Sequence, residues 1–175
     1  MVETIDLKQQ VIKWRQHLHM YPELSHQEHE TARYIYNQLV TFPHLEVKRL
    51  TETSVCAFLR GTKTENKGHT ILLRADIDAL PIEEETDLLF KSTNPGVMHA
   101  CGHDAHPAML LGAAKALAER GTDFCGEIRF VFQHAEEVTP GGAAQLVALG
   151  IVENVDYAFA LHVSPDYEVG QFAMK

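Results

Sequence analysis

Four side chains of types that commonly bind metal ions lie within the last 75 residues of the chain. Cys101 and His103 belong to the segment MHACGHDAH, Glu137 belongs to FQHAEE, and His162 belongs to FALHV. A thiolate, two imidazoles and a carboxylate suit a divalent ion of borderline softness, zinc first, with manganese, cobalt or nickel as alternatives. The four residues therefore predict a metal site.

Glu137 has a second acid, Glu136, directly before it. The pair follows the apolar, strand-like segment 127–133 and precedes Pro140 and two glycines, which favours a place at a pocket rather than on an outer face. One carboxylate could bind the metal while its neighbour takes a proton from metal-bound water. The pair gives the predicted metal site a hydrolytic purpose, although such a pair is also common in a solvated turn.

Asp76 and Asp78 stand two residues apart at the end of the apolar, strand-like segment 70–75. Successive side chains of a strand alternate between its faces, so these two point the same way. They could orient a metal-binding imidazole by hydrogen bonding to its other nitrogen. The alternative interpretation is a turn that ends the strand before Pro81.

Taken one at a time, the candidate ligands also have ordinary interpretations. Cys101 and His103 are equally consistent with a buried thiol and a loop histidine, and His162 with a hydrogen-bonded histidine at a sheet edge. Three further histidines could contact a substrate or tune the two glutamates, namely His99, His106 and His134. No role is predicted for the histidines on expected helix faces and turns, which are His17, His19, His26, His29, His44 and His69.

The composition sets bounds on the class of protein. The chain has 175 residues, of which 45% are hydrophobic and 22% are charged, and this predicts one globular domain with a substantial core. Twenty-four acidic against fifteen basic residues, without a Lys/Arg cluster, argue against a nucleic acid or an anionic membrane as partner. The start resembles no leader peptide and no apolar run is long enough to span a bilayer, so a cytoplasmic protein is expected. Three irregularly spaced cysteines predict reduced thiols.

Hydrophobic periodicity and turn residues define the elements that would position these groups. Helices are expected at 7–20, 25–42, 104–120 and 141–150, and strands at 46–50, 55–60, 70–75, 127–133, 155–161 and 169–174. The strand at 155–161 is expected to be buried. Ser25 with Glu28 is expected to cap the second helix, and Asp104 the third through the amide of His106. This order predicts a three-layer α/β/α sandwich with a mostly parallel mixed sheet, in which ligands bind beyond the carboxyl ends of the strands.

Five segments of the chain together resemble a known enzyme family. They are RQHLHMYPELSHQEHET (15–31), LLRADIDALPIEEE (72–85), MHACGHDAHPAMLLGAAKAL (98–117), FQHAEE (132–137) and LHV (161–163). From about residue 7 to the C-terminus the chain is similar to the metal-dependent amidohydrolase and carboxypeptidase family. The relevant branch contains aminoacylases, hippurate hydrolases and indoleacetyl-amino-acid hydrolases. The resemblance implies a zinc-peptidase-like fold.

The resemblance also implies a reaction and a site. The reaction would be hydrolysis of the amide bond of an N-acyl amino acid at a centre of one or two divalent ions, chiefly zinc or manganese. By motif position, the metal ligands would be Cys101, His103, Glu137 and His162. Glu136 would be the general base that later protonates the leaving amine.

The chain departs from the family pattern in two ways. His134 stands where the family usually has proline, and Thr139–Pro140 interrupts a glycine-rich run, so the loop near Glu136 is expected to differ in shape. Members of the family are also roughly twice as long. The resemblance thus implies that residues 1–175 form the N-terminal part of the catalytic domain, truncated before a lid domain and a C-terminal catalytic segment with a last histidine ligand. The unpaired sheet edge would favour a homo-oligomer or a complementing C-terminal segment.

Three other functions stay open at this point. The chain could be a catalytically inactive remnant or an assembly subunit that keeps a partial metal site. A structural zinc protein is less consistent with the sequence because a closed tetrahedral site would not need the neighbouring Glu136. A thiol catalyst centred on Cys101 is disfavoured because His103, two residues away, is poorly placed to act as its base.

Overall fold

The computed structural model describes the backbone of residues 2–174 and the side chains of residues 6–174. Its helices are α1 (Val2–Met20), α2 (His29–Leu39), α3 (Ala105–Glu119) and α4 (Gly142–Ala148). Its strands are β1 (Leu45–Thr51), β2 (Ser54–Arg60), β3 (His69–Asp76), β4 (Gly126–Gln133) and β5 (Tyr157–Ala160). Within the described residues, no helix is long and apolar enough to cross a lipid bilayer.

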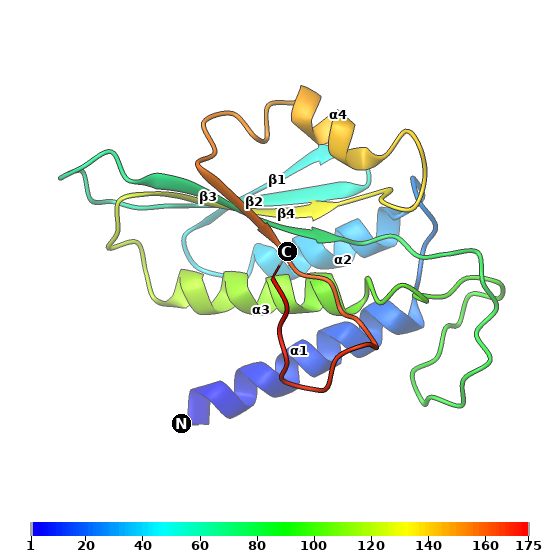
Figure 1. Ribbon diagram of the computed structural model, residues 1–175. Helices are drawn as coiled ribbons and strands as arrows, with labels where there is room; N and C mark the ends of the chain where they lie inside the picture. Colours follow the sequence, from blue (N-terminus) through cyan, green and yellow to red (C-terminus); the bar gives the residue numbers. More distant parts are fainter. Residues whose placement is uncertain (1, 175) are drawn as a thin grey trace.

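The five strands form one mixed sheet in the order β1-β2-β4-β3-β5. β3 pairs in parallel with both β4 and β5, whereas β2 is antiparallel to both of its neighbours, β1 and β4. Four strands therefore run in one direction and β2 runs in the other. α2 and α3 cover one face of the sheet, α1 packs against α3, and α4 lies on the opposite face (Figure 1). The predicted three-layer α/β/α sandwich is confirmed.

A hydrophobic core lies between the sheet and the layer formed by α2 and α3. Phe130 and Phe132 of β4 are fully buried in it, as is Leu111 of α3. Burial of each such side chain contributes about 1.5–3 kcal/mol. α1 can approach α3 closely because α3 carries Gly112, where a Cβ atom would lie 2.7 Å from Val11 Cγ2. This packing holds the middle of α3 against α1.

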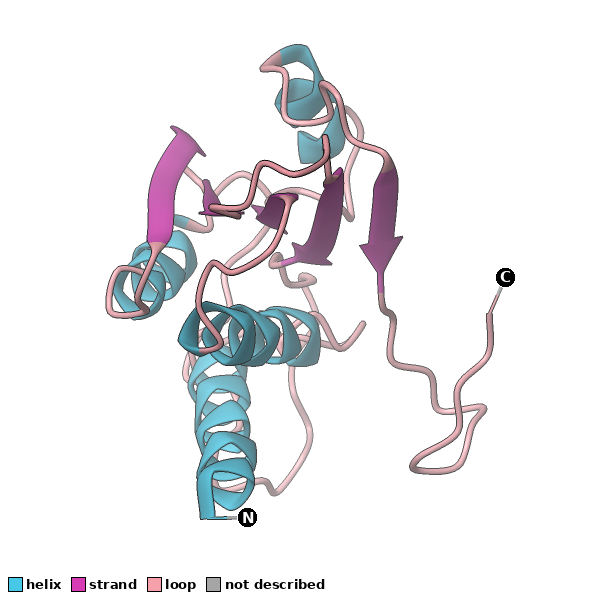
Figure 2. Cartoon of the chain, turned by 90° about the vertical axis from the view of Figure 1, so that its left-hand side faces the viewer, coloured by secondary structure: helices cyan, strands magenta, loops and turns pink. Residues whose placement is uncertain are grey.

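Two expectations about the C-terminal strands are wrong. The strand expected to be buried at 155–161 is β5, which spans only Tyr157–Ala160 and lies at the edge of the sheet. Because β5 pairs with β3 on one side only, Tyr157 and Phe159 are 52% and 58% exposed. Residues 169–174 form no strand and belong to a tail that leaves the body of the sheet (Figure 2). Both segments have the composition of buried strands, but the described chain has no layer that covers them.

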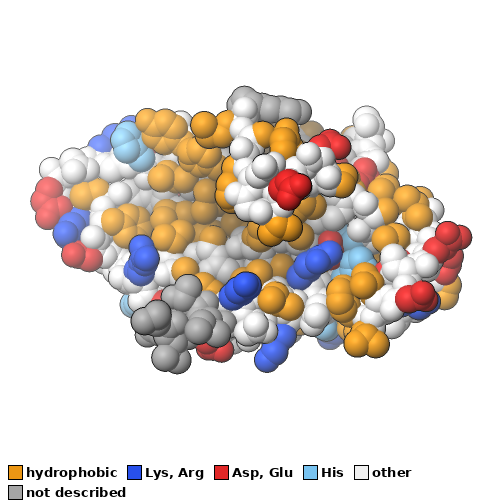
Figure 3. Space-filling view, turned by 60° about the horizontal axis from the view of Figure 1, so that its bottom comes forward, with side chains coloured by type: hydrophobic (Ala, Val, Ile, Leu, Met, Phe, Trp, Pro, Cys, Tyr) orange, Lys and Arg blue, Asp and Glu red, His pale blue; other side chains and the backbone are white. Residues whose placement is uncertain are grey.

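A hydrophobic groove of about 240 Å³ lies between β5 and α3. Its walls include Leu73 of β3, Met109 and Leu110 of α3, and Phe159 of β5. Hydrophobic side chains gather on this face of the molecule (Figure 3). Together with the unpaired edge of β5, the groove forms an apolar surface of the kind that marks protein contact sites.

The predicted capping of two helices is also wrong. Neither Ser25 nor Glu28 caps α2, because the Ser25 hydroxyl donates to Asp78 and the Glu28 carboxylate accepts from the amide of Ala135. The reason is that both polar groups satisfy buried partners in other parts of the chain instead of the nearby helix end. The carboxylate of Glu23 instead accepts from amides of the first turn of the helix.

Asp104 directly precedes α3, as expected, yet its carboxylate does not cap the helix. It accepts hydrogen bonds from Arg15 and lies 2.9 Å from Nδ1 of His19. Hydrogen bonds from charged donors are roughly twice as strong as those from a neutral amide. Tertiary contacts with α1 therefore replace the expected local contact with His106.

Candidate metal centre

The candidate residues meet at one edge of the sheet. β4, β3 and β5 are neighbours that run in the same direction, so their carboxyl ends lie together. The loops that follow these three strands carry the acids and His162, and the loop before α3 carries Cys101 and His103. This is the edge at which ligands bind in open α/β sheets.

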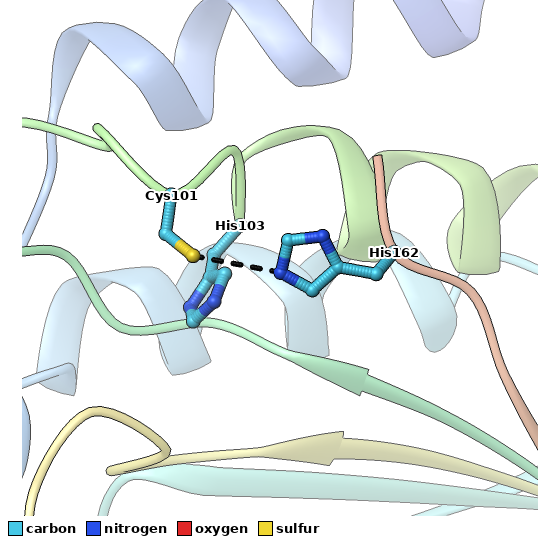
Figure 4. Close-up of side chains that lie close together, drawn as sticks. All are labelled: Cys101, His103 and His162. Atoms are coloured by element: carbon cyan, nitrogen blue, oxygen red, sulfur yellow. Dashed lines mark hydrogen bonds between the residues drawn. The ribbon is translucent and has the colours of Figure 1, made fainter. Parts of the chain in front are cut away.

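Cys101, His103 and His162 point toward one another across this edge (Figure 4). The sulfur of Cys101 lies 3.5 Å from Nε2 of His162, and one ligand atom from each residue falls within 4.8 Å of the others. A tetrahedral zinc ion with bonds of about 2.3 Å to sulfur and about 2.0 Å to nitrogen would separate those two atoms by roughly 3.5 Å. The spacing of the donor atoms therefore fits a metal ion.

The ring of His103 is held in one orientation by Asp78. Its Nδ1 lies 3.0 Å from the backbone carbonyl oxygen of Asp78, which can only accept, so this nitrogen carries the hydrogen. Nε2 faces Glu137 Oε1 at 3.5 Å and Glu136 Oε2 at 3.9 Å. Both Nε2 and Glu137 Oε1 are buried without a hydrogen-bond partner. A positive charge between these two atoms, either a proton on Nε2 or a metal ion, would satisfy both of them.

Electrostatics at this gap favour positive charge. Burial acts to lower the pKa of His103, but its hydrogen bond with Asp78 and the negative charge of Asp76 outweigh burial and leave the pKa raised. Asp78 itself is almost fully buried, and burial acts to raise its pKa. Hydrogen bonds from His103 and Ser25 nevertheless keep the pKa of Asp78 well below its usual range. The carboxylate stays ionised beside the candidate ligand.

His162 presents its Nε2 to the cluster in the same way. Its Nδ1 lies 2.6 Å from the carbonyl oxygen of Val163 and must donate to it, which leaves Nε2 as an acceptor facing Cys101. Burial and the nearby Glu137 raise the pKa of the Cys101 thiol to about 11. A bound divalent ion would reverse this effect, because a coordinating thiol is deprotonated.

Asp76 contacts a different imidazole from the one that Asp78 contacts. Its Oδ1 lies 2.6 Å from Nδ1 of His106, whereas Nδ1 of His103 is 3.8 Å away. Nε2 of His106 accepts a hydrogen bond from the amide of Val163 at 3.1 Å. Both nitrogens of His106 are therefore engaged, and the ring ties the segment that bears His162 to β3.

Asp78 also connects two loops. Its Oδ2 accepts hydrogen bonds from the Ser25 hydroxyl at 2.6 Å and from the amide of Glu137 at 3.0 Å. The carboxylate thus contacts the glutamate loop while its own backbone carbonyl orients His103. One residue just after β3 thus links the imidazole to the acid pair.

No role was predicted from the sequence for His19, but the structure shows one. Its ring is 4% exposed and lies between two carboxylates, with Nδ1 2.9 Å from Asp104 Oδ2 and Nε2 3.1 Å from Glu84 Oε1. Because both neighbours can only accept when ionised, the ring is a buried imidazolium. It ties α1 to the start of α3 and to the loop after β3. The only signal for it was its place in the resembling segment 15–31.

We expect His19 to make the stability of the fold depend on pH. The hydrogen bond with Asp104 raises its pKa, with a further contribution from Glu84 that opposes burial. Its contribution is fully present below the unfolded pKa of about 6.5 and is lost as pH rises through the raised folded pKa. The two carboxylates have lowered pKa values, so they are still ionised at about pH 5.

Urea unfolding of the wild type and of His19→Gln measures this effect. The wild type should exceed the variant in free energy of unfolding most clearly near about pH 5–6, and the difference should narrow toward about pH 9. A difference that does not change with pH would show that His19 is not held as an imidazolium.

The structure also shows the surroundings of the three histidines that flank the candidate ligands, His99, His106 and His134. His99 and His106 are 4% and 2% exposed. His99 has no hydrogen-bond partner among the described residues, and burial lowers its pKa to about 4. His134 lies 3.0 Å from Gln145 Oε1 through its Nε2 and so contacts α4.

Residues 72–175 match the peptidase family M20/M25/M40, and this segment is more than half of the chain. The chain belongs to this family. Among its relatives in the peptidase family, it is 50% identical over 169 residues to an N-acyl-L-amino acid amidohydrolase of Geobacillus stearothermophilus, covering 97% of the chain and 45% of the relative. It is 44% identical to an N-acetyl-L-cysteine deacetylase of Bacillus subtilis, covering 99% of the chain and 41% of the relative.

A solved structure of the same family has the same fold. It is a dinuclear metal-binding peptidase of the M20 family from Bacillus subtilis, 40% identical, with a TM-score of 0.86 over 94% of this chain and 46% of that one. The M20-family chain described here thus spans less than half the length of these relatives.

Proposed function

We propose that this chain carries the metal centre of an amidohydrolase that cleaves N-acyl amino acids. The ligands of one or two divalent ions, zinc or manganese, are Cys101, His103, Glu137 and His162. The observation that carries the proposal is the pair of buried atoms of ligand type, His103 Nε2 and Glu137 Oε1, which lie 3.5 Å apart and have no hydrogen-bond partner among the described residues. A metal ion in this gap would satisfy both groups.

Each of the two histidine ligands is oriented by a hydrogen bond that its other ring nitrogen, Nδ1, donates. Asp78 accepts from Nδ1 of His103, and the carbonyl of Val163 accepts from Nδ1 of His162, so both rings turn Nε2 toward the centre. When bound, a divalent ion lowers the pKa of water and polarises the amide carbonyl of the substrate. The chain's own groups then supply proton transfer and orientation.

Glu136 is the general base in this proposal. Its side chain is 41% exposed, whereas that of Glu137 is 20% exposed, so Glu136 is the acid of the pair that faces solvent and substrate. Its Oε2 lies 3.9 Å from Nε2 of His103, beside the centre. From there it takes a proton from the attacking water and delivers it to the nitrogen of the leaving amine.

The substrate class comes from the relatives. The amidohydrolase at 50% identity acts, by its name, on N-acyl-L-amino acids, and the deacetylase at 44% identity acts on N-acetyl-L-cysteine. Both substrates contain an amide between an acyl group and an amino acid. The chemistry of a metal centre beside a proton acceptor suits hydrolysis of this bond.

Residues 1–175 form, in this proposal, the N-terminal part of a larger catalytic unit. The relatives are more than twice as long as the segment that they share with this chain. The unpaired edge of β5 and the adjacent groove are the surface on which a C-terminal catalytic segment, or a second copy of the chain, completes the sheet. A lid domain would close over the exposed side of Glu136.

The test combines metal analysis with hydrolysis of acetyl- and hippuryl-amino acids. The chain is assayed alone and with the C-terminal half of the Geobacillus amidohydrolase added as a separate polypeptide. We expect stoichiometric divalent metal in both samples and turnover that is higher in the mixture. A chain that binds metal but stays inactive in both would indicate an assembly subunit or a catalytically inactive remnant. A chain that binds no metal would contradict the proposal.

A further inference from the structure

The connection between α1 and α2, residues 21–28, lies against the loops that carry the candidate catalytic groups. The amide of Ala79 donates to the carbonyl oxygen of Glu23 at 2.8 Å, and Leu24 forms an isolated parallel bridge with Ala79. The connection is thereby fixed beside Asp78. It belongs to neither the sheet nor the metal cluster, so its polar groups need another explanation.

Glu28 is the least expected of these groups, because its side chain is carboxylic and yet fully buried. Its Oε1 accepts a hydrogen bond from the amide of Ala135 at 2.7 Å, across 107 residues of sequence. Its Oε2 is buried and has no hydrogen-bond partner among the described residues. Burial of a carboxyl group is costly, so a single contact with a backbone amide is a weak reason for a purely structural glutamate.

The backbone conformation of Ala135 sets the directions of the two glutamates that follow it. It has φ of +48°, a left-handed conformation that costs a residue with a side chain about 1–2 kcal/mol, and it directly precedes Glu136 and Glu137. Glu28 holds its amide, and the amide of Gly142 donates to its carbonyl oxygen at 2.9 Å. A change in φ at Ala135 would redirect both glutamates.

Ser25 supports the same turn at a second point. Its hydroxyl donates to Oδ2 of Asp78 at 2.6 Å, and the same oxygen accepts the amide of Glu137 at 3.0 Å. One connection therefore reaches the glutamate turn directly through Glu28 and indirectly through Ser25 and Asp78.

We propose that Glu28 is a positioning residue which, through the amide of Ala135, holds Glu137 in place to bind metal and Glu136 in place to transfer a proton. Ser25 assists it through Asp78. The inference rests on the proposed function, because it assumes that Glu137 is a metal ligand. Burial raises the pKa of Glu28, despite the amide hydrogen bonds that lower it. Glutamine has the shape of this side chain and keeps its acceptor oxygen, so it is a close substitute.

Glu28→Gln and Glu28→Met form a matched pair for the test, since glutamine keeps the acceptor oxygen and methionine fills the same space without one. The measurement is the Kd for Mn²⁺ and for Zn²⁺, each titrated alone into the 175-residue chain by calorimetry. We expect Glu28→Met to bind about 10-fold more weakly or worse, as is typical when a group that supports a metal ligand is removed. Glu28→Gln should stay close to the wild type. Ile35→Val, a fully buried change in α2, controls for general loss of stability.

The double variant Glu28→Met with Glu137→Gln separates this proposal from the proposed function. If Glu28 acts through Glu137, the methionine change should add no further loss once Glu137 is replaced. Additive losses would overturn the positioning role. A Kd that does not change in Glu137→Gln would instead contradict the assignment of Glu137 as a ligand, whatever Glu28 does.

Folding is checked by circular dichroism before each titration. If Glu28→Met does not fold, Ser25→Ala decides the matter, because Ser25 is only partly buried and the change removes a single hydroxyl. A weaker Kd with an unchanged melting temperature would support the positioning role of the connection. An unchanged Kd would overturn it.

Discussion

Replacing Glu136 with glutamine is expected to lower kcat for an N-acyl amino acid by about 10²–10⁴-fold, the usual contribution of a general base. Glutamine has the same shape but cannot accept a proton from water or deliver one to the leaving amine. Because Glu136 is the more exposed acid and Glu137 the more buried one, the metal content should stay that of the wild type. The assay uses the chain in whichever form shows turnover.

Glu137→Gln is the matched control for this experiment. It removes the acid that faces His103 Nε2 at 3.5 Å, so we expect it to weaken metal binding together with activity. If Glu137→Gln kept the metal and lost turnover, and Glu136→Gln lost the metal, the two roles would have to be exchanged. If both variants kept full activity, neither residue could serve as the base.

Replacing His103 with alanine is expected to weaken binding of Zn²⁺ or Mn²⁺ by more than about 100-fold, since even groups that only support a ligand contribute about 10–100-fold. His103 is the one residue shared by all three groups of described side chains that are spaced to hold a metal ion. Its loss should therefore affect the centre whichever of these groups binds.

His17→Phe is the control for His103→Ala. It removes the imidazole of α1 that stacks on Tyr34, with ring centroids 3.8 Å apart, and phenylalanine preserves the stacking. Calorimetric titration of both variants should show a lost site in the first and an intact site in the second. Equal affinities in His103→Ala and the wild type would place the metal elsewhere or exclude it.

The elements of this fold could be predicted because their signals are local. The apolar run in β3 and the alternation of Ile128, Phe130 and Phe132 in β4 each depend on neighbouring residues. The order of helices and strands then limits the arrangement to a sheet with helices on both faces. Among the strands, the failures are at the C-terminal end, where β5 has a buried composition but lies exposed at the edge. Whether a strand is buried depends on what packs against it, and the residues of the strand alone do not determine that.

For the candidate site, the residue types and their convergence could be predicted from the sequence, but the side-chain contacts could not. The types of its groups could be read from the chain, and their convergence follows because β3, β4 and β5 end at one edge. The orientation of these side chains could not be predicted from the sequence. That Asp78 contacts His103 while Asp76 contacts His106 depends on side-chain directions set by packing of α3.

By itself, the sequence determined the layers of the fold, the strand ends that carry the candidate site residues, and the types of candidate ligand atoms that gather there. These follow from hydrophobic periodicity and residue type, which act over a few neighbouring positions. Only the tertiary structure decided that His19 is a buried imidazolium and that Glu28 holds the turn before the acid pair. Those contacts join residues 65 to 107 positions apart, and such contacts form only when whole elements pack together.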